Sequence, residues 1–219
     1  MPLSLDTDGA ALVQGAFSGD PLHSLRGRLS EVPSSRAGLR NLAFEFPKLK
    51  ELSCSPSFRK WLPSPELEPV RYLLFDKTPD ANWPVAWHQD RTICVQQRID
   101  TPGYGPWTTK NGTPHVEPPV ELLENMTTLR LHLDDTPTSN GALRIIPGSH
   151  KHGKLTSEEN AALVQKQAVD CDCAAGDVLL MKPLVLHSSG RATSPSHRRV
   201  IHIEYAMRSM LHRNLDWAE

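Results

Sequence analysis

The stretch Leu-Arg-Leu-His-Leu-Asp at residues 129–134 decides the fold. Its apolar and polar residues alternate strictly, which predicts a β-strand with one buried face, because successive side chains of a strand point to opposite sides. The apolar face carries Leu129, Leu131 and Leu133. The polar face carries Arg130 and His132, with Thr128 in the same direction. If this polar face lines a barrel, we expect Thr128 to contact a cofactor and Arg130 and His132 to contact a substrate.

Further short strands surround this one along the chain. They are predicted at 70–75, 87–98, 143–147, 178–181, 184–187 and 199–207. Residues 1–65 instead look helical: Leu22, Leu25 and Leu29 recur at helical spacing, and Ser55 or Ser57 is a candidate cap of a short helix. Helices followed by strands between Pro/Gly turns predict a mainly β sandwich or jelly roll over 70–207, with the helices packed outside.

The composition indicates one ordinary globular domain spanning residues 1–219. The chain has 219 residues and a net charge of −1, with no basic stripe for nucleic acid. No apolar run is long enough for a membrane span, and residues 1–17 do not resemble a secretory signal. The four cysteines match neither a zinc knuckle nor a disulfide framework, so we expect reduced thiols and a cytoplasmic protein. The oligomeric state cannot be read from this sequence.

Residues 100–119 are rich in proline and glycine and do not fit a strand pattern. A loop this long in a small domain is typical of a lid, a binding loop or a disordered segment. It contains Trp107, Thr108, Lys110 and His115. We expect it to cover an active site.

A metal site is predicted from three residues. Iron(II) that binds both O₂ and a keto acid needs an incomplete protein shell, such as two imidazoles and one carboxylate. His88 and Asp90 lie two apart on a strand-like stretch, so both side chains point the same way. His187 follows much later, at the end of an apolar strand. We expect His88, Asp90 and His187 to hold Fe(II).

Arg198 is the candidate partner for a keto acid. It begins the last predicted strand, shortly after His187, so an antiparallel return can bring it beside the metal. A guanidinium binds a carboxylate through two parallel hydrogen bonds. We therefore expect Arg198 to hold the distal carboxylate of 2-oxoglutarate, with Ser194 adding a hydroxyl. Lys77 is either a further contact to cofactor or substrate or, as the more ordinary interpretation, a solvated lysine at a strand end.

Two other segments carry a His-x-Glu spacing and compete for the metal role. His115-Val-Glu117 is flanked by prolines and lies off any predicted strand, so a loop role, including substrate contact by His115, is expected. His202-Ile-Glu204 lies on a strand, but the only histidine after it is too near to come from another strand. We interpret the His202/Glu204 face as solvated.

The chain resembles the phytanoyl-CoA dioxygenase family of Fe(II)/2-oxoglutarate oxygenases. The matching pieces, in order, are Trp-His-Gln-Asp (87–90), Leu-His-Leu-Asp-Asp (131–135), Asn-Gly-Ala-Leu-Arg-Ile-Ile-Pro-Gly-Ser-His (140–150), Gly-Asp-Val-Leu-Leu (176–180), and His187-Ser-Ser followed by Ser194 and Arg198. The resemblance implies a double-stranded β-helix with iron held by His88, Asp90 and His187. It also implies that Arg198 binds 2-oxoglutarate and that Gln89 and Trp107 lie near the cofactor. Halogenating relatives lack the carboxylate that Asp90 supplies here, so oxygenation is favoured.

The expected function is therefore hydroxylation of an unactivated C–H bond of a small molecule, with 2-oxoglutarate and O₂ as co-substrates and release of succinate and CO₂. Desaturation, cyclisation or epimerisation on the same iron stays open, as does a binding or other-metal cupin. A serine hydrolase is disfavoured because no Gly-x-Ser-x-Gly elbow is present.

Overall fold

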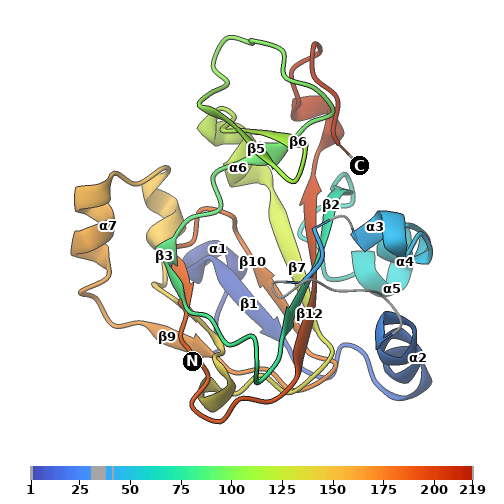
Figure 1. The fold of residues 1–219 in the computed structure, drawn as a ribbon. Coiled ribbons are helices and arrows are strands. Elements are labelled where there is room, and N and C mark those ends of the chain that lie inside the picture. Colours follow the sequence, from blue (N-terminus) through green and yellow to red (C-terminus); the bar gives the residue numbers. More distant parts are fainter. Residues whose placement is uncertain (1, 31–37, 41, 219) are drawn as a thin grey trace.

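The computed structural model describes residues 2–30, 38–40 and 42–218, in which two antiparallel sheets form the centre of the molecule. The larger sheet has the order β1-β10-β7-β12-β2, with bounds Ala10–Val13, Val178–Met181, Thr127–His132, Arg198–Ala206 and Glu68–Lys77. The smaller sheet has the order β3-β11-β8-β9, with bounds Val85–His88, His187–Ser189, Leu143–Ile145 and Val169–Cys171. The predicted mainly β fold with outer helices is confirmed (Figure 1).

The helices lie outside the sheets. Those of the N-terminal part gather beside β2 and β12 in Figure 1, and they are α2 (Gly19–Ser30), α3 (Leu42–Glu45), α4 (Lys48–Cys54) and α5 (Pro56–Arg59). The others are α1 (Leu5–Asp8), α6 (Val120–Asn125) and α7 (Ser157–Leu163), with 3₁₀ turns at Thr138–Asn140, Ser149–His152 and Arg208–Met210. In α2 the buried residues are Leu22, Leu25 and Leu29, as their spacing predicts. Residues 31–37 of the predicted helical part, with residues 1 and 41, lie outside the described residues, as does residue 219 at the other end of the chain.

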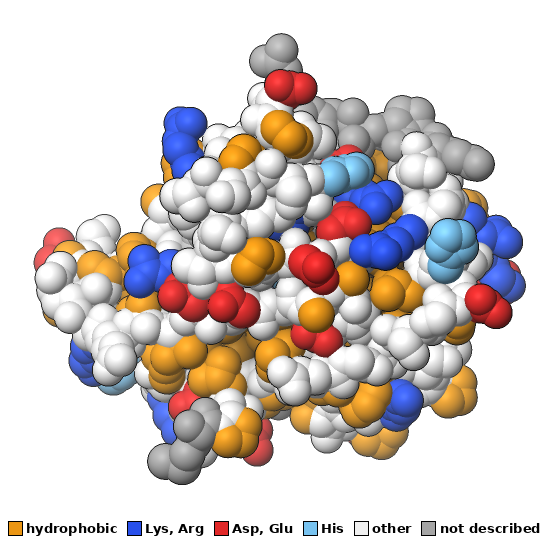
Figure 2. Space-filling model, turned by 90° about the horizontal axis from the view of Figure 1, so that it is seen from below, with side chains coloured by type: hydrophobic (Ala, Val, Ile, Leu, Met, Phe, Trp, Pro, Cys, Tyr) orange, Lys and Arg blue, Asp and Glu red, His pale blue; other side chains and the backbone are white. Residues whose placement is uncertain are grey.

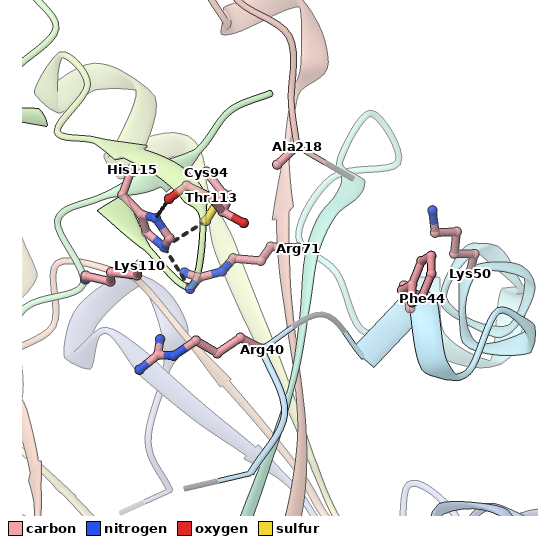
Figure 3. A pocket seen from close by; sticks show the side chains of 10 residues that line it. Arg40, Phe44, Lys50, Arg71, Cys94, Lys110, Thr113, His115 and Ala218 are labelled. Atoms are coloured by element: carbon pink, nitrogen blue, oxygen red, sulfur yellow. Dashed lines mark hydrogen bonds between the residues drawn. The ribbon is translucent and has the colours of Figure 1, made fainter. Parts of the chain in front are cut away.

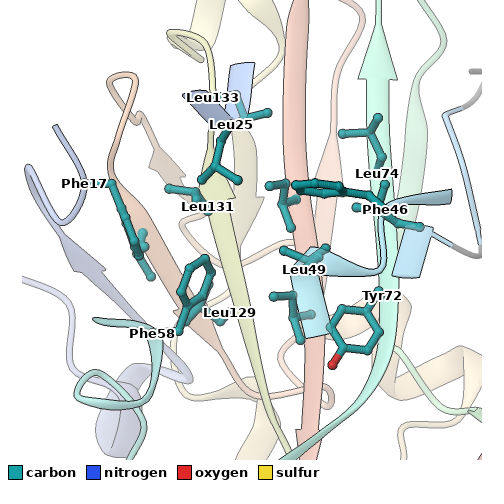
Figure 4. Packing of buried hydrophobic residues seen from close by; sticks show 14 of the residues in the cluster. Phe17, Leu25, Phe46, Leu49, Phe58, Tyr72, Leu74, Leu129, Leu131 and Leu133 are labelled. Atoms are coloured by element: carbon teal, nitrogen blue, oxygen red, sulfur yellow. The ribbon is translucent and has the colours of Figure 1, made fainter. Parts of the chain in front are cut away.

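Alternation along the strands separates the apolar core from the interior of the barrel. Leu129, Leu131 and Leu133 pack with Ile201 and Ile203 against the N-terminal helices. Figure 4 shows this layer, with phenylalanines from the helical side facing the leucines of the sheet. The opposite face of the same strands is turned toward the smaller sheet. The strict period of two therefore places every second side chain of β2, β7 and β12 inside.

The space between the sheets is filled at one end and hollow at the other. The filled end is an apolar cluster of Ala10, Leu143, Ile145, Cys171, Cys173, Leu179, Met181 and Val185. Burial raises the pKa of Cys171 and of Cys173 to about 12, so both remain thiols at neutral pH. The hollow end is lined by polar side chains of β2, β7, β12, β3 and β11.

Three predictions about local structure are wrong. Residues 10–13 are a strand, not helix, because they pair with the open edge of β10. The predicted strand at 184–187 begins only at His187, since a turn joins Val185 N to Lys182 O. The 100–119 segment is not an open loop: β5 (Trp107–Lys110) and β6 (Thr113–Val116) form a hairpin that pairs with β4 (Ile93–Cys94).

The hairpin turn has an explanation in the sequence. Asn111 and Gly112 have φ angles of 50° and 77°. Two successive residues with positive φ make the turn whose twist matches a β-hairpin, and Asn-Gly is the pair that favours it. The Asn-Gly dipeptide was the signal for this hairpin.

The surface is charged and mixed. On the face in Figure 2, acidic, basic and apolar side chains are interspersed, as the near-zero net charge suggests. Among the described residues, no helix combines the length and the apolar character that a membrane crossing requires.

Candidate metal centre

Three predicted ligands come together at the hollow end of the barrel. One ligand atom from each of His88, Asp90 and His187 lies within 4.8 Å of the other two. The Nε2 atoms of His88 and His187 are each 3.7 Å from an oxygen of Asp90. His88 and His187 are direct partners in the pairing of β3 with β11, which explains why residues far apart in sequence meet here. Within the described residues this is the only such cluster.

Backbone carbonyls hold both imidazoles in the orientation that ligation needs. The Nδ1–H of His88 donates to the carbonyl of Ala86 at 2.8 Å, and that of His187 donates to Val185 at 2.8 Å. Because a carbonyl only accepts, the hydrogen must sit on Nδ1, and the lone pair of Nε2 faces Asp90. Such contacts fix the tautomer and the ring plane of a metal-bound histidine.

The charges of the three groups also suit a divalent cation. Burial lowers the pKa of His187 to about 4, so the ring is neutral at pH 7. Burial alone raises the pKa of Asp90, but positively charged neighbours, Arg130 among them, outweigh it, and the net shift is downward. The carboxylate is therefore ionised. One carboxylate and two imidazoles on one side of an ion form the facial triad of non-haem Fe(II) enzymes and leave its other side open.

The triad opens into a cavity of about 310 Å³ between the two sheets. Its walls include Lys77, Trp83, Arg130, His132, Thr136, Ser189, Arg198, His202 and Glu204. A cavity of this size is at the small end of the range found for ligand sites. The predicted contacts Lys77, Arg130 and His132 thus share one space with the metal ligands.

Arg198 reaches this cavity from the start of β12. It stands opposite Lys77 in the pairing of β12 with β2. Its Nη1 donates to the carbonyls of Asn140 (3.2 Å) and Gly141. Burial and the nearby charge of Arg130 lower its pKa to about 10, so it stays a cation at neutral pH. The two carbonyls hold the guanidinium in place within the wall.

The buried cations near Arg198 exceed the carboxylates that face them. Burial, Arg198 and Arg130 together lower the pKa of Lys77 to about 8, and burial lowers that of Arg130. The Nε of Arg130 and the Nε2 of His132 are buried without a hydrogen-bond partner. Lys77 donates to the carbonyl of Trp83 (2.7 Å) and lies 3.4 Å from the hydroxyl of Ser189. A cavity with three mutually repelling cations and unused polar atoms fits a dianion such as 2-oxoglutarate.

Four predicted cofactor contacts do not line this cavity. The side chain of Gln89 donates to the carbonyls of Gly153 and Leu184 and accepts from Leu155 N. The side chain of Gln89 points away from the cavity, because successive side chains of an extended segment point to opposite sides and Gln89 lies between His88 and Asp90.

The other three lie elsewhere. Ser194 is exposed in the loop before β12, and its backbone N–H donates to Ser139 O. Trp107 packs on the hairpin with the cluster around Ile93 and Val116. Thr128 is buried two residues before Arg130 on the same strand, and it does not line the cavity. Ser189 and Thr136 supply hydroxyls in the cavity instead, and sequence reasoning missed both.

The His202/Glu204 face is buried in the cavity, so the predicted solvated face is wrong. The side chain of His202 is 4% exposed and that of Glu204 9%. Arg130 Nη1 donates to His202 Nδ1 at 2.9 Å, and Arg71 Nη1 donates to Glu204 Oε1 at 2.8 Å. One face of β12 is covered by the N-terminal helices and the other faces the cavity between the sheets. The alternation of apolar and polar residues does not show that both faces are buried. Lys77, 6% exposed, is likewise no solvated lysine.

The remaining histidine motifs have other roles. His115 lies on β6, not in a loop, and its Nε2 meets Arg71 Nη2 (3.3 Å) and Cys94 Sγ (3.1 Å). His132-Leu-Asp134 also has the His-x-Asp spacing, but the Asp134 carboxylate lies beyond β7 and binds Arg199.

The fold and the metal cluster define a class of protein, the cupin-like non-haem iron oxygenases. The chain matches the sequence model described as phytanoyl-CoA dioxygenase (PhyH) over residues 5–200, and it belongs to this family. Together with the His-Asp-His cluster, the family identifies the protein as an Fe(II)- and 2-oxoglutarate-dependent oxygenase. The predicted class of enzyme and its cofactors are confirmed.

Solved structures show the same fold at low sequence identity. HygX from Streptomyces hygroscopicus with nickel and 2-oxoglutarate bound is 17% identical, with a TM-score of 0.66 over 92% of this chain and 84% of that one. AviO1 from Streptomyces viridochromogenes is 22% identical (TM-score 0.64; 92% and 91%). The epimerase SnoN from nogalamycin biosynthesis is 17% identical (TM-score 0.65; 93% and 80%). No curated protein matches the sequence significantly.

Proposed function

We propose that the enzyme hydroxylates an unactivated C–H bond of a small molecule bound between the two sheets, with 2-oxoglutarate consumed to succinate and CO₂. The observation that carries the proposal is the cavity itself. It holds His88, Asp90 and His187 on one wall and the cations Lys77, Arg130 and Arg198 on another. One enclosed space thus offers a place for a divalent metal and for a dianionic keto acid.

Each residue has a part that its contacts support. When bound, iron supplies the activation of O₂, which protein side chains cannot perform. His88, Asp90 and His187 hold it from one side. Arg198, braced by two backbone carbonyls, binds the distal carboxylate of 2-oxoglutarate as the predicted role requires, and Lys77 stands beside it. Lys77, Arg130 and Arg198 are buried, which strengthens their interaction with an anion.

A small substrate agrees with the size of the cavity, about 310 Å³. Structures of similar fold contain small molecules: HygX has been solved with hygromycin B, and SnoN with nogalamycin RO. Desaturation, cyclisation and epimerisation use the same site, and analysis of the product distinguishes them from hydroxylation. Four free cysteines support a cytoplasmic location, which we propose as well.

The test is anaerobic titration of the purified protein with Fe(II) and 2-oxoglutarate, followed by the visible charge-transfer absorption of the chelate. We expect a band in the wild type that Asp90→Ala weakens, since one of the three metal ligands is lost. Arg198→Ala is expected to raise the 2-oxoglutarate concentration at half-saturation roughly tenfold or more, since one charged hydrogen-bond partner is lost. Arg213→Ala, at an exposed arginine outside the cavity, is the matched control.

Succinate formation in air provides the second readout. A wild-type protein that binds Fe(II) but gives neither band nor succinate contradicts the proposal and favours a binding protein. A band unaffected by Arg198→Ala contradicts the role of Arg198 alone.

A further inference from the structure

A second cavity of about 220 Å³ adjoins the first, on the side away from the filled end of the barrel. Arg40, Arg71 and Lys110 line both cavities, so the two share a wall. The outer cavity is completed by Phe44, Lys50, Cys94, His115 and others. A ligand that reaches the metal from solvent through this outer cavity passes these three cations.

The charges around the outer cavity are all of one sign. Its lining contains Arg40, Lys50, Arg71 and Lys110 and, among the described residues, no carboxylate. Figure 3 shows Arg40, Arg71 and Lys110 on one side of it, whereas Phe44 and Lys50 stand on the helical side. Arg71 is paired with Glu204 through Nη1 (2.8 Å). No described acidic side chain pairs with Arg40, Lys50 or Lys110.

Arg71 is held rigidly between the two cavities. Besides Glu204, its Nη2 meets the Nε2 of His115 at 3.3 Å. The Nδ1–H of His115 donates to Thr113 O at 3.0 Å, and burial lowers the pKa of this histidine, so the ring is neutral and Nε2 accepts. Arg71 is thus neutralised by Glu204 and fixed by His115. Of the three cations that line both cavities, Arg40 and Lys110 are therefore the two without an acidic partner among the described residues.

The apolar wall completes a binding site. Phe44 is 82% exposed and is the only large apolar side chain of the described residues with such exposure. An isolated exposed phenylalanine is ordinary. This one lines the same cavity as four cations, where it offers a carbon surface to the body of a ligand whose charged group faces Arg40 and Lys110.

We infer that the substrate carries an anionic group, a carboxylate or a phosphate, which binds Arg40 and Lys110 while the rest of the molecule extends toward His88 and Asp90. The inference rests on the proposed function, since it places the reacting carbon at the metal. It names the substrate class, a small anionic molecule. This molecule is distinct from 2-oxoglutarate, because the carboxylates of 2-oxoglutarate bind deeper in the barrel. The free cations also attract such a ligand over a distance of about one Debye length.

The experiment measures binding of simple probes to the protein loaded anaerobically with Fe(II) and saturating 2-oxoglutarate. Occupation by 2-oxoglutarate keeps the probes from Arg198. The probes are phenyl phosphate, benzoate and phenol, which share a ring and differ in charge, and calorimetry gives their dissociation constants. We expect one or both anions to bind and phenol to bind at least tenfold more weakly, since it lacks the charged contacts. The anion that binds more tightly identifies the natural group.

Variants locate the bound anion. Arg40→Ala/Lys110→Ala is expected to weaken binding of the anion roughly tenfold, because two charge-assisted contacts are lost, with about a threefold loss for each single change. Arg40→Lys restores part of the affinity. Lys166→Ala, an exposed lysine outside both cavities, is the control. The double variant keeps the charge-transfer band, because the hydrogen bonds and ion pairs that hold the metal ligands and Arg198 involve neither residue.

The outcomes separate the two proposals. The anion site would be overturned, while the band remains, if neither anion bound at millimolar concentration, if wild type and double variant bound equally, or if phenol bound as tightly as both anions. Absence of the band in the wild type would instead overturn the proposed function.

Discussion

Replacing Lys77 by methionine tests whether the cations of the cavity form a binding site for a dianion. Lys77 is 6% exposed and faces Arg198, with Arg130 close by. Burial and these two cations lower its pKa from 10.5 to about 8. Folding therefore works against the charge of Lys77 whenever no anion is bound.

The size of the effect follows from the pKa shift. Below pH 8 the lysine is charged in both the folded and the unfolded chain, and a shift of about 2.5 units costs the folded state about 3 kcal/mol. Between pH 8 and 10.5 the folded chain loses the proton first, so the cost declines, and at pH 9.5 about 1 kcal/mol remains. Methionine removes this cost but also the hydrogen bond to Trp83 O, worth about 1 kcal/mol. Lys77→Met should be about 2 kcal/mol more stable at pH 7 and near wild type at pH 9.5.

The assay is urea unfolding of the metal-free protein at pH 7 and pH 9.5, in a buffer without phosphate or 2-oxoglutarate. Lys166→Met, at an exposed lysine with no described partner, serves as the control and should change stability little at either pH. The same Lys77 variant should bind 2-oxoglutarate more weakly. If Lys77→Met lowers stability equally at both pH values, the lysine is not strained by its neighbours, and the argument for a cationic cofactor site loses its main support.

The remaining predictions concern the metal and the core. Chelation of the metal by EDTA should stop the reaction, and added Fe(II) but not Zn(II) should restore it. Succinate formation and oxygen consumption measure both effects. Leu131→Ala, at a residue with 0% exposure, should cost about 3 kcal/mol in urea unfolding. Gly176→Ala should cost about 2 kcal/mol or more, since φ is +93° and a Cβ would lie 2.0 Å from Phe17 O. Arg71→Met should cost about 3 kcal/mol by removing the guanidinium that pairs with the buried Glu204, and adding Glu204→Gln should recover part of the loss.

Much of the core could be predicted because alternation is a local property. The period of two in 129–134 predicts which side chains share a face: Leu129, Leu131 and Leu133 lie in the core, whereas Arg130 and His132 line the cavity. Alternation likewise places His88 and Asp90 on one side of their segment and Gln89 on the other. Missed elements have local reasons. Residues 10–13 do not alternate and become β1 only because β10 offers a free edge.

The sequence predicted which residues compose the candidate metal site, since His88 and Asp90 lie two apart on an extended segment and their side chains point the same way. It could not determine that His187 lies beside His88, because that neighbour relation depends on the register of β11 against β3. Nor could it place His202 and Glu204 inside the barrel, since alternation separates two faces without saying what covers each. Tertiary structure decided both through hydrogen bonding between distant strands and through the smaller sheet that closes over β12. These long-range contacts join Lys77 to Arg198 and the metal ligands to one cavity.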